Sequence, residues 1–422
     1  MNQNMLGRLL LFCYFLTFIE GEISAQPKLH LKPIGLAKLD SAILYSIRTK
    51  QLPGAVVLIA QNGNIVHFKA FGESDIENHK PMTKDAIFRL ASMSKAIVTL
   101  SLLKLCEEGK CNTEDPISKF LPEFSQPEIL LSKDSLDGSY ILKTSKATQP
   151  ILIKHILTHT AGFASQYGGN MQEIYTKLAA NQYNYSINEF SKKLAKLPLT
   201  HEPGQGWIYG PGILIAGRII EVITGKPLNI SLKESILDQM EMKDTKFFLD
   251  EVDAARLTTL YKPGANNSLE VSDPGSIKSN KISGQKVFFN GGGGLNATIL
   301  DYYNFCQMIL DNGVFKGKTI AKASTINLMK TDQTPITIEA DISPKDNLKN
   351  EGFTFGYQIK RKDNPNDPLP KGSLNWSGAT GPTYFIEPTS GIIAILMLQV
   401  QPNSQIELRR DFRKLVMNSF TK

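Results

Sequence analysis

The chain has 422 residues, of which 41% are hydrophobic and 21% are charged, and its formal net charge is +7. This length exceeds what one compact core usually holds, so we expect two lobes. The charge is scattered, and over residues 345–371 it alternates in sign, which argues against a nucleic-acid-binding patch. Three cysteines follow residue 25, namely Cys106, Cys111 and Cys306, and this odd number argues against a disulfide scaffold. The sequence does not decide whether Cys106 and Cys111 form a single disulfide.

The first 25 residues have the pattern of a secretory signal. Arg8 precedes an apolar run from Leu9 to Ile19, and small residues follow at Ser24 and Ala25. The run is too short to span a bilayer, which takes about 20 residues. We therefore expect cleavage after Ala25 and a secreted or periplasmic protein with no stable membrane insertion after signal removal. The alternative is a buried N-terminal helix.

The first part of the mature chain predicts a helix packed on a hairpin. Apolar residues at helical spacing predict a helix over residues 36–47. Two β-rich runs then flank Asn62-Gly63, a strong hairpin signal. A further helix is expected over residues 96–109, where Gly109 ends it. Residues 115–203 have a helical, loop-rich pattern with few strand-like runs.

The second half predicts helices and then strands. Helices are expected over residues 213–225 and 298–313, the latter just after four glycines at 291–294, and over residues 405–420. Strands are expected over residues 353–360, 383–388 and 391–400. The order predicts an α/β (α+β) sandwich whose antiparallel sheet is flanked by helices and completed by both chain ends. Its α/β lobe would comprise about residues 30–112 and 285–422, with a mostly helical lobe inserted over about residues 113–284.

The stretch Leu90-Ala-Ser-Met-Ser-Lys95 carries the first chemical signal. In a helix, Lys95 would lie one turn above Ser92, on nearly the same face. A serine hydroxyl is a poor nucleophile until a base takes its proton. A lysine becomes such a base only if burial and neighbours lower its pKa from about 10.4 toward neutrality. The alternative is that Ser92 is a plain helix cap.

The Ser-x-x-Lys spacing alone is not specific, because it recurs at Ser101–Lys104 and at Ser283–Lys286. Ser101 is expected deep within its helix, and Ser283 in a loop with no helix after it. Ser92 is the one that stands at a helix N-terminus, where the dipole favours developing negative charge.

The sequence resembles the serine hydrolases related to class C β-lactamases and DD-peptidases, which include the family VIII carboxylesterases. The resemblance covers about residues 36–418. It rests on Ser92-x-x-Lys95, on the segments at residues 151–163 and 203–212, on the glycine turn at 292–295, and on Trp376-Ser377-Gly378 in the place of a Lys-Thr-Gly motif. These motifs occur in the order that the family has.

The resemblance implies roles for several residues. Ser92 would be the nucleophile that forms an acyl-enzyme, while Lys95 and Tyr209 share the proton transfers. Because the two would titrate as a coupled pair, the sequence does not say which is the proton acceptor. The oxyanion hole would consist of the backbone amides of Ser92 and Ala379. Gly378 would allow close approach of the backbone to the substrate.

Two departures from the family pattern bear on the substrate. Trp376 stands where the related β-lactamases and DD-peptidases carry a lysine, so a cation for a substrate carboxylate is missing there. An aromatic at this position is similar to the family VIII esterases and favours neutral, apolar acyl groups. Pro211 stands where the tyrosine motif has an asparagine, which weakens recognition of amide groups. Trp376, Ser377, Gly378 and Pro211 are therefore the expected substrate-binding residues.

A rival assignment uses His155 and His159, four residues apart, as metal ligands or as part of a Ser-His-Asp triad. No His-Glu-x-x-His pattern and no Gly-x-Ser-x-Gly elbow supports it. We interpret both histidines as structural hydrogen-bonding residues. The chemistry requires no cofactor and no metal.

The sequence therefore predicts an exported serine hydrolase that cleaves a small-molecule ester or acyl substrate, with no nucleic-acid partner. One alternative is a D-amino-acid peptidase or DD-peptidase, or a weak class C-like β-lactamase. Another, of a different class, is a non-catalytic protein that binds cell-wall fragments or a partner. The physiological substrate and the oligomeric state stay open.

Overall fold

The computed structural model describes residues 30–136, 139–167, 169–180, 182–334 and 350–421. The expected signal peptide at residues 1–25 lies outside this part of the chain. Within the described ranges, no helix combines the length and the apolar character that a membrane crossing needs.

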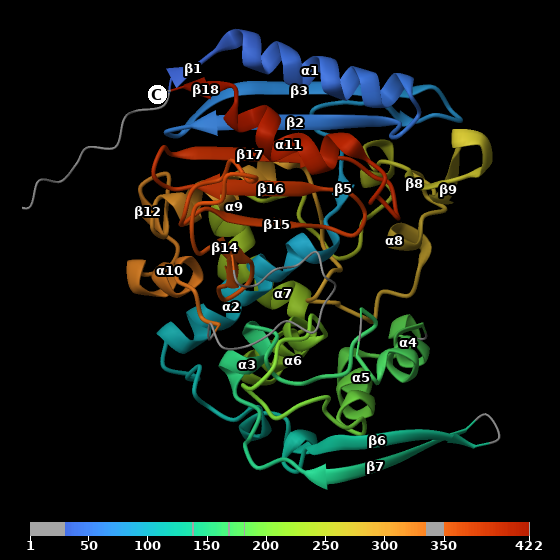
Figure 1. Cartoon of the computed structure of the whole chain (residues 1–422), viewed down its shortest axis with the longest axis vertical. Coiled ribbons are helices and arrows are strands. Elements are labelled where there is room, and N and C mark those ends of the chain that lie inside the picture. Colours follow the sequence, from blue (N-terminus) through green and yellow to red (C-terminus); the bar gives the residue numbers. More distant parts are fainter. Residues whose placement is uncertain (1–29, 137–138, 168, 181, 335–349, 422) are drawn as a thin grey trace, which may run out of the picture.

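The centre of the fold is an eight-stranded antiparallel sheet (Figure 1). In spatial order its strands are β13 (Glu351–Phe353), β14 (Gln358–Lys360), β15 (Leu374–Ser377), β16 (Thr383–Glu387), β17 (Ile392–Met397), β2 (Gly54–Gln61), β3 (Asn64–Asp75) and β4 (Lys80–Pro81). The N-terminal and C-terminal parts of the chain meet where β2 pairs with β17, with Leu58 opposite Ile395. The predicted sheet, completed by both chain ends, is confirmed.

The hairpin between β2 and β3 follows from its turn residues. Asn62 and Gly63 both have positive φ, at 51° and 77°, which a two-residue hairpin turn of this kind requires. At the other edge, the expected single strand over residues 353–360 is instead the end of β13, a turn and β14. Gly356, with φ of 113°, lies in that turn.

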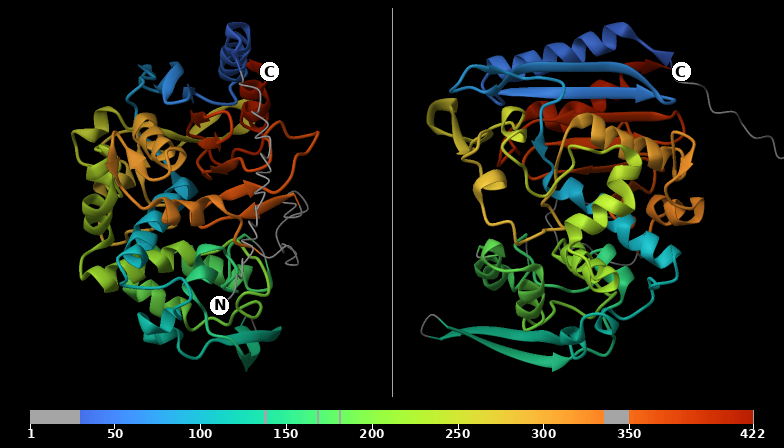
Figure 2. Two further views of the ribbon diagram at one scale, coloured as in Figure 1. Left: turned by 90° about the vertical axis from the view of Figure 1, so that its left-hand side faces the viewer. Right: turned by 180° about the vertical axis from the view of Figure 1, so that it is seen from behind.

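Both faces of β2 are buried, and alternate residues serve two different cores. Ala55, Val57 and Ile59 face the helices α1 (Pro33–Arg48) and α11 (Glu407–Met417), which pack against each other over one face of the sheet (Figure 2). The terminal strands β1 (His30–Leu31) and β18 (Phe420–Thr421) pair beside them. A strand covered on both faces reads as a continuous apolar run, as β2 does.

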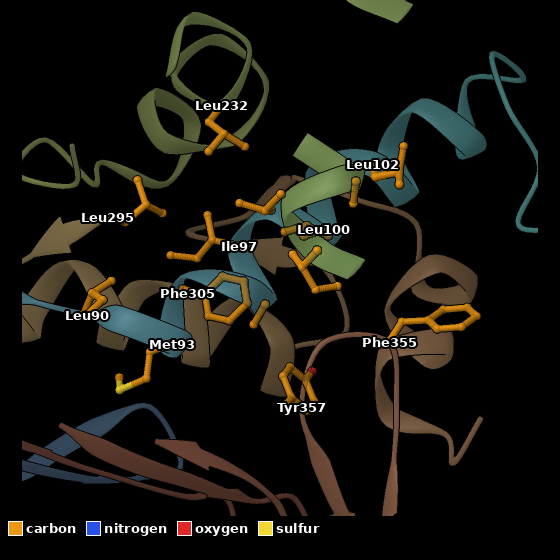
Figure 3. Close-up of a cluster of buried hydrophobic side chains, with 14 of the residues drawn as sticks. Leu90, Met93, Ile97, Leu100, Leu102, Leu232, Leu295, Phe305, Phe355 and Tyr357 are labelled. Carbon is orange, nitrogen blue, oxygen red and sulfur yellow. The ribbon is translucent and has the colours of Figure 1, made fainter. Parts of the chain in front are cut away.

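The other face of the sheet packs on α2 (Ser94–Glu107) and α9 (Ile299–Leu310). Figure 3 shows Ile97 of α2 among Leu295, Phe305 and Leu232. The same hydrophobic cluster continues to Ile215 of α6 (Gly212–Thr224). One core therefore joins this face of the sheet to the helical part of the molecule, and the predicted lobe boundaries at residues 113 and 284 stay a prediction.

The helical part lies at the end of the molecule away from α1 (Figure 1). Its helices are α3 (Ile153–Leu157), α4 (Gln172–Ala180), α5 (Ile187–Leu194), α6 and α7 (Leu228–Leu232). The remaining elements connect it to the sheet or lie at its margin: β5 (Phe88–Arg89), β8 (Leu260–Pro263), β9 (Leu269–Asp273), α8 (Asn280–Ser283), β10 (Asn296–Ala297), β11 (Val314–Phe315), β12 (Lys318–Thr319) and α10 (Ala323–Lys330).

One expectation for this region is wrong. Residues 115–203 contain a long antiparallel hairpin of β6 (Glu128–Leu136) and β7 (Ser139–Lys146), where we expected few strands. Its described side chains include no fully buried one, and Leu131 and Ile141 are exposed. Leu130 and Leu142 are half-buried against the core, but exposed apolar residues stand next to them in the sequence. The strands therefore lack the clean alternation of apolar and polar residues by which strands are recognised.

Candidate active site

Ser92 lies in the short turn between β5 and α2. The chain leaves β5 through Ala91, whose φ of 46° is unusual for a residue with a Cβ atom, and passes through the turn Ala91–Met93 into the helix. The cap position of α2 is Met93, and no side chain caps that end. Ser92 is therefore not a plain helix cap. Its Oγ instead receives two hydrogen bonds, from Lys95 Nζ at 3.1 Å and from the Tyr209 hydroxyl at 2.7 Å.

Lys95 is almost completely buried, with 5% of its surface exposed. Besides Ser92, its Nζ donates to the carbonyl of Gly292 at 2.5 Å. That carbonyl belongs to the glycine turn, in which the Asn290 side chain accepts the Gly292 N–H at 2.9 Å. Burial lowers the pKa of Lys95 to about 8. About one tenth of this lysine is therefore neutral at pH 7, and the neutral fraction rises with pH.

Tyr209 approaches Ser92 from the loop that precedes α6. Its ring packs on His159 at a centroid distance of 4.6 Å and on Trp376 at 5.4 Å. The Ser165 hydroxyl donates to the backbone carbonyl of Tyr209 and fixes the loop. Burial raises the pKa of the Tyr209 phenol, although its hydrogen bond with Ser92 acts in the opposite direction. The phenol is therefore protonated at neutral pH and donates to Ser92.

The structure brings the three predicted catalytic residues together from distant parts of the sequence, whereas the residues of the Ser101–Lys104 and Ser283–Lys286 pairs contact other groups. Ser101 Oγ contacts Ser235 Oγ at 3.2 Å, while Lys104 Nζ donates to the carbonyl of Ile320. Ser283 ends the short helix α8, and its hydroxyl donates to the Ser279 carbonyl at 3.0 Å. Spacing alone did not distinguish the pairs, but their hydrogen bonds do.

The two histidines make structural hydrogen bonds. His155 Nδ1 accepts the backbone N–H of Leu152 at 3.2 Å, at the start of α3. His159 lies beyond the end of that helix with φ of 61°, and its Nδ1 accepts the Gly210 N–H at 3.4 Å. Burial lowers the pKa of His155 to about 4 and, together with the charge of Lys95, holds that of His159 well below its usual range. Both side chains are therefore neutral at physiological pH.

Strand β15 brings Gly378 and Ala379 beside the turn that carries Ser92. A Cβ atom on Gly378 would lie 2.4 Å from the carbonyl oxygen of Leu90, so a side chain has no room there. Gly378 is thus required because the β15 backbone passes close to the backbone of Leu90, just before Ser92. Asn403 Nδ2 donates to the Ala379 carbonyl at 2.6 Å and fixes that peptide. Ser92 and Ala379 line the same cavity, while the oxyanion role of their amides stays a prediction.

The cavity over Ser92 has a volume of about 650 Å³. Of the predicted residues, Ser92, Lys95, Tyr209, Pro211 and Ala379 line it. Trp376, Ser377 and Gly378 lie outside its described lining. Trp376 packs behind Tyr209 and against Phe353, at a centroid distance of 5.2 Å. Its direct contact with a substrate stays a prediction.

The cavity also contains charged residues that the sequence analysis missed. Arg89 and Lys281 line it, as does Asp273. Arg89 Nε donates to Asp273 at 2.9 Å, and its Nη1 donates to the Thr258 carbonyl at 2.7 Å. Arg89 and Asp273 are far apart in the chain and belong to no local motif, so the sequence contains no signal that pairs them.

Comparison with known proteins agrees with the fold. Residues 38–417 match the Beta-lactamase family, and the chain therefore belongs to this family. Esterase EstB of Burkholderia gladioli is 28% identical over 380 residues, which cover 86% of this chain and 89% of the relative. A lovastatin esterase of Penicillium rubens is 26% identical over 409 residues, which cover 91% of this chain and 98% of the relative.

Solved structures share the fold. EstCE1, described as a hydrolase with promiscuous acyltransferase activity, superposes with a TM-score of 0.76 at 24% identity, covering 91% of this chain and 99% of that one. Unliganded simvastatin synthase of Aspergillus terreus also superposes with a TM-score of 0.76, at 22% identity, covering 91% and 98%. Because this chain belongs to the Beta-lactamase family and its relatives include named esterases, we conclude that it is an enzyme, a serine hydrolase related to β-lactamases.

Proposed function

We propose that this protein is an exported carboxylesterase that cleaves small esters through an acyl-enzyme at Ser92, with Lys95 and Tyr209 moving the protons. The observation that carries the proposal is the position of Ser92 Oγ, which hydrogen-bonds both Lys95 Nζ and the Tyr209 hydroxyl. The named esterases among the curated relatives support the substrate class.

The directions of the two pKa shifts favour a division of labour. Neutral Lys95 takes the Ser92 proton as Oγ bonds to the acyl carbon of the ester. The amides of Ser92 and Ala379 bind the resulting oxyanion. When the bond to the leaving alcohol breaks, Tyr209 gives that oxygen a proton and recovers one from Lys95. Water then attacks the acyl-enzyme, and the reverse proton transfers release the acid and restore the Ser92 hydroxyl.

Labelling with a fluorophosphonate tests the nucleophile. We expect a single adduct, which peptide mapping places on Ser92, and slower labelling of the Lys95→Ala and Tyr209→Phe proteins. Ser101→Ala is the matched control, because Ser101 belongs to the same Ser-x-x-Lys pattern but contacts Ser235. An adduct on another residue, or full hydrolysis of p-nitrophenyl butyrate by the Ser92→Ala protein, would remove the basis for the mechanism.

Substrate comparison separates the proposal from its alternatives. We expect a higher kcat/KM for p-nitrophenyl butyrate than for a D-Ala-terminated peptide or a cephalosporin, since Pro211 offers no side-chain amide to such substrates. A preference for the peptide or the cephalosporin would make the protein an amide-cleaving relative. Tight binding of cell-wall fragments without any turnover would make it a binding protein.

Export rests on the sequence of residues 1–25 and has its own test. Expressed from its full coding sequence in a bacterial host, the protein should accumulate outside the cytoplasm with Gln26 as its first residue. An uncleaved chain that stays in the cytoplasm would contradict export and leave the esterase proposal intact.

A further inference from the structure

The active-site cavity contains a lysine to which the mechanism gives no role. Lys281 is the second residue of the short helix α8, and its side chain lines the cavity that contains Ser92. Its Nζ donates to the carbonyl of Gly294 at 3.0 Å. Among the described residues, no carboxylate lies within ion-pair distance of this ammonium group. The Lys281 ammonium group therefore donates one hydrogen bond to a neutral carbonyl and has two further N–H donors.

The acidic residue that lines the same cavity is already hydrogen-bonded to other groups. Asp273 is the one carboxylate among the described residues that line the cavity. It accepts hydrogen bonds from Arg89 Nε at 2.9 Å, from Ser279 Oγ at 2.9 Å and from the Asn280 N–H at 3.2 Å. Asp273 thus forms its ion pair with Arg89, and among the described residues Lys281 has no ion-pair partner. Burial lowers the pKa of Lys281 to about 8, so most of it is still charged at pH 7.

Lys281 and the catalytic lysine are held by the same turn. Lys95 Nζ bonds the carbonyl of Gly292, and Lys281 Nζ bonds that of Gly294, two residues further on. Two residues of chain span at most about 7 Å. Ser92 and Lys281 also line the same cavity, so a substrate that fills this cavity while acylating Ser92 would contact Lys281 with another of its groups.

We propose that Lys281 is an anion subsite, which binds a carboxylate that the ester substrate carries away from its scissile bond. The subsite rests on the proposed esterase function and adds the substrate class to it. Related β-lactamases and DD-peptidases carry a lysine at the position of Trp376. In this protein, Lys281 supplies a cation to the cavity from a different segment of the chain. The carboxylate belongs either to the acyl group or to the leaving alcohol, and substrates can distinguish these two cases.

Two matched pairs of esters test the subsite. In the first, p-nitrophenyl hydrogen adipate is compared with its terminal amide, so the charge lies on the acyl chain. In the second, p-acetoxybenzoate is compared with p-acetoxybenzamide, so the charge lies on the leaving group. We expect the protein to prefer the carboxylate in one pair by about tenfold or more in kcat/KM, as a charge-assisted hydrogen bond allows. Lys281→Gln should abolish that preference and leave the amide rates within about twofold.

Lys286→Gln is the matched control. Lys286 lies five residues further on and also donates to a backbone carbonyl, that of Leu249 at 3.2 Å, but it lines a different cavity. Its variant should keep the carboxylate preference. A purely structural Lys281 would instead give a variant with a lower melting temperature and equal losses on both members of each pair. That result overturns the proposal. So does a wild-type protein with no preference for the carboxylate, or a Lys281→Gln protein that keeps the preference.

A binding measurement separates this inference from the esterase function itself. The Ser92→Ala protein, with and without Lys281→Gln, is titrated in a calorimeter with adipic acid monoamide and with adipamide. We expect the monoamide to bind more tightly, through Lys281. If no ester is hydrolysed but this preference is present and needs Lys281, the esterase function fails and the subsite stands. Equal affinity for both compounds overturns the subsite whatever the hydrolytic activity.

Discussion

At the scale of single residues, the buried lysine beside Ser92 predicts a pH profile. Lys95 must be neutral to accept the Ser92 proton, and burial lowers its pKa to about 8. Acylation by a neutral ester should therefore rise with pH and level off above about pH 8. At pH 6 it should be roughly 100-fold below that plateau, because each pH unit below the pKa reduces the neutral fraction about tenfold. The measurement is the pre-steady-state release of p-nitrophenol across this pH range.

Two variants assign the inflection. Tyr209→Phe should lower the plateau by about 10² to 10⁴ and keep the inflection near pH 8, because the phenol stays protonated throughout this range. Lys95→Met should remove the inflection. If the inflection disappears in Tyr209→Phe but survives in Lys95→Met, the tyrosine is the group that titrates, and the proposed proton path is wrong.

The catalytic residues were more predictable than their surroundings. Ser92, Lys95 and Tyr209 each lie in a motif whose residues are close in the chain, so a resemblance located them. Lys281 and Asp273 reach the site through long-range contacts, and the sequence did not show that the carbonyl of Gly292, in the glycine turn, accepts a hydrogen bond from Lys95. Nothing local distinguishes Lys281 from the other lysines of this chain, and only the fold places it in the cavity.

At the scale of elements, the contact of β15 with the Ser92 turn depends on Gly378. The Gly378→Ala methyl group would lie 2.4 Å from the Leu90 carbonyl oxygen and 2.9 Å from the Pro382 side chain. The strand end must move, and the Ala379 amide moves with it. We expect kcat to fall by about 10² to 10³, the usual cost of losing one oxyanion donor. Ala379→Ser, which keeps the amide on an exposed residue, should stay within a few-fold of the wild type; an equal loss in both variants would argue against the amide.

The elements that the sequence predicted have strong local signals. The helices α1, α2, α6, α9 and α11 each combine helical apolar spacing with burial of one or more faces. The hairpin β6–β7 was missed, because it carries apolar residues on its exposed face as well as on the face that packs on the core, so apolar and polar residues do not alternate cleanly. An Asp137-Gly138 pair in the sequence is the signal by which it could have been found.

At the scale of the whole molecule, the two faces of the sheet pack into different hydrophobic cores, and only one of these cores contains α2. One face carries α1 and α11, which bring the two chain ends together, and the other carries α2 with Ser92. The order of elements predicted that both ends complete the sheet. It did not predict that β2 and β17 pair directly, because strand neighbours so distant in sequence are chosen by the packing of the complete fold.

This separation predicts a variant that is destabilised but active. Phe412 of α11 is 1% exposed and packs on Phe385 of β16 at a centroid distance of 6.2 Å. Phe412→Ala should lower the free energy of unfolding by about 3 to 5 kcal/mol, through lost burial and the cavity left behind. The urea midpoint should fall, while kcat/KM without urea stays within twofold. Arg410→Ala, on the exposed side of the same helix, should change stability by less than about 0.5 kcal/mol. If Phe412→Ala lost activity while its unfolding stayed unchanged, the outer layer would be acting on the catalytic face, and the two faces would not be independent.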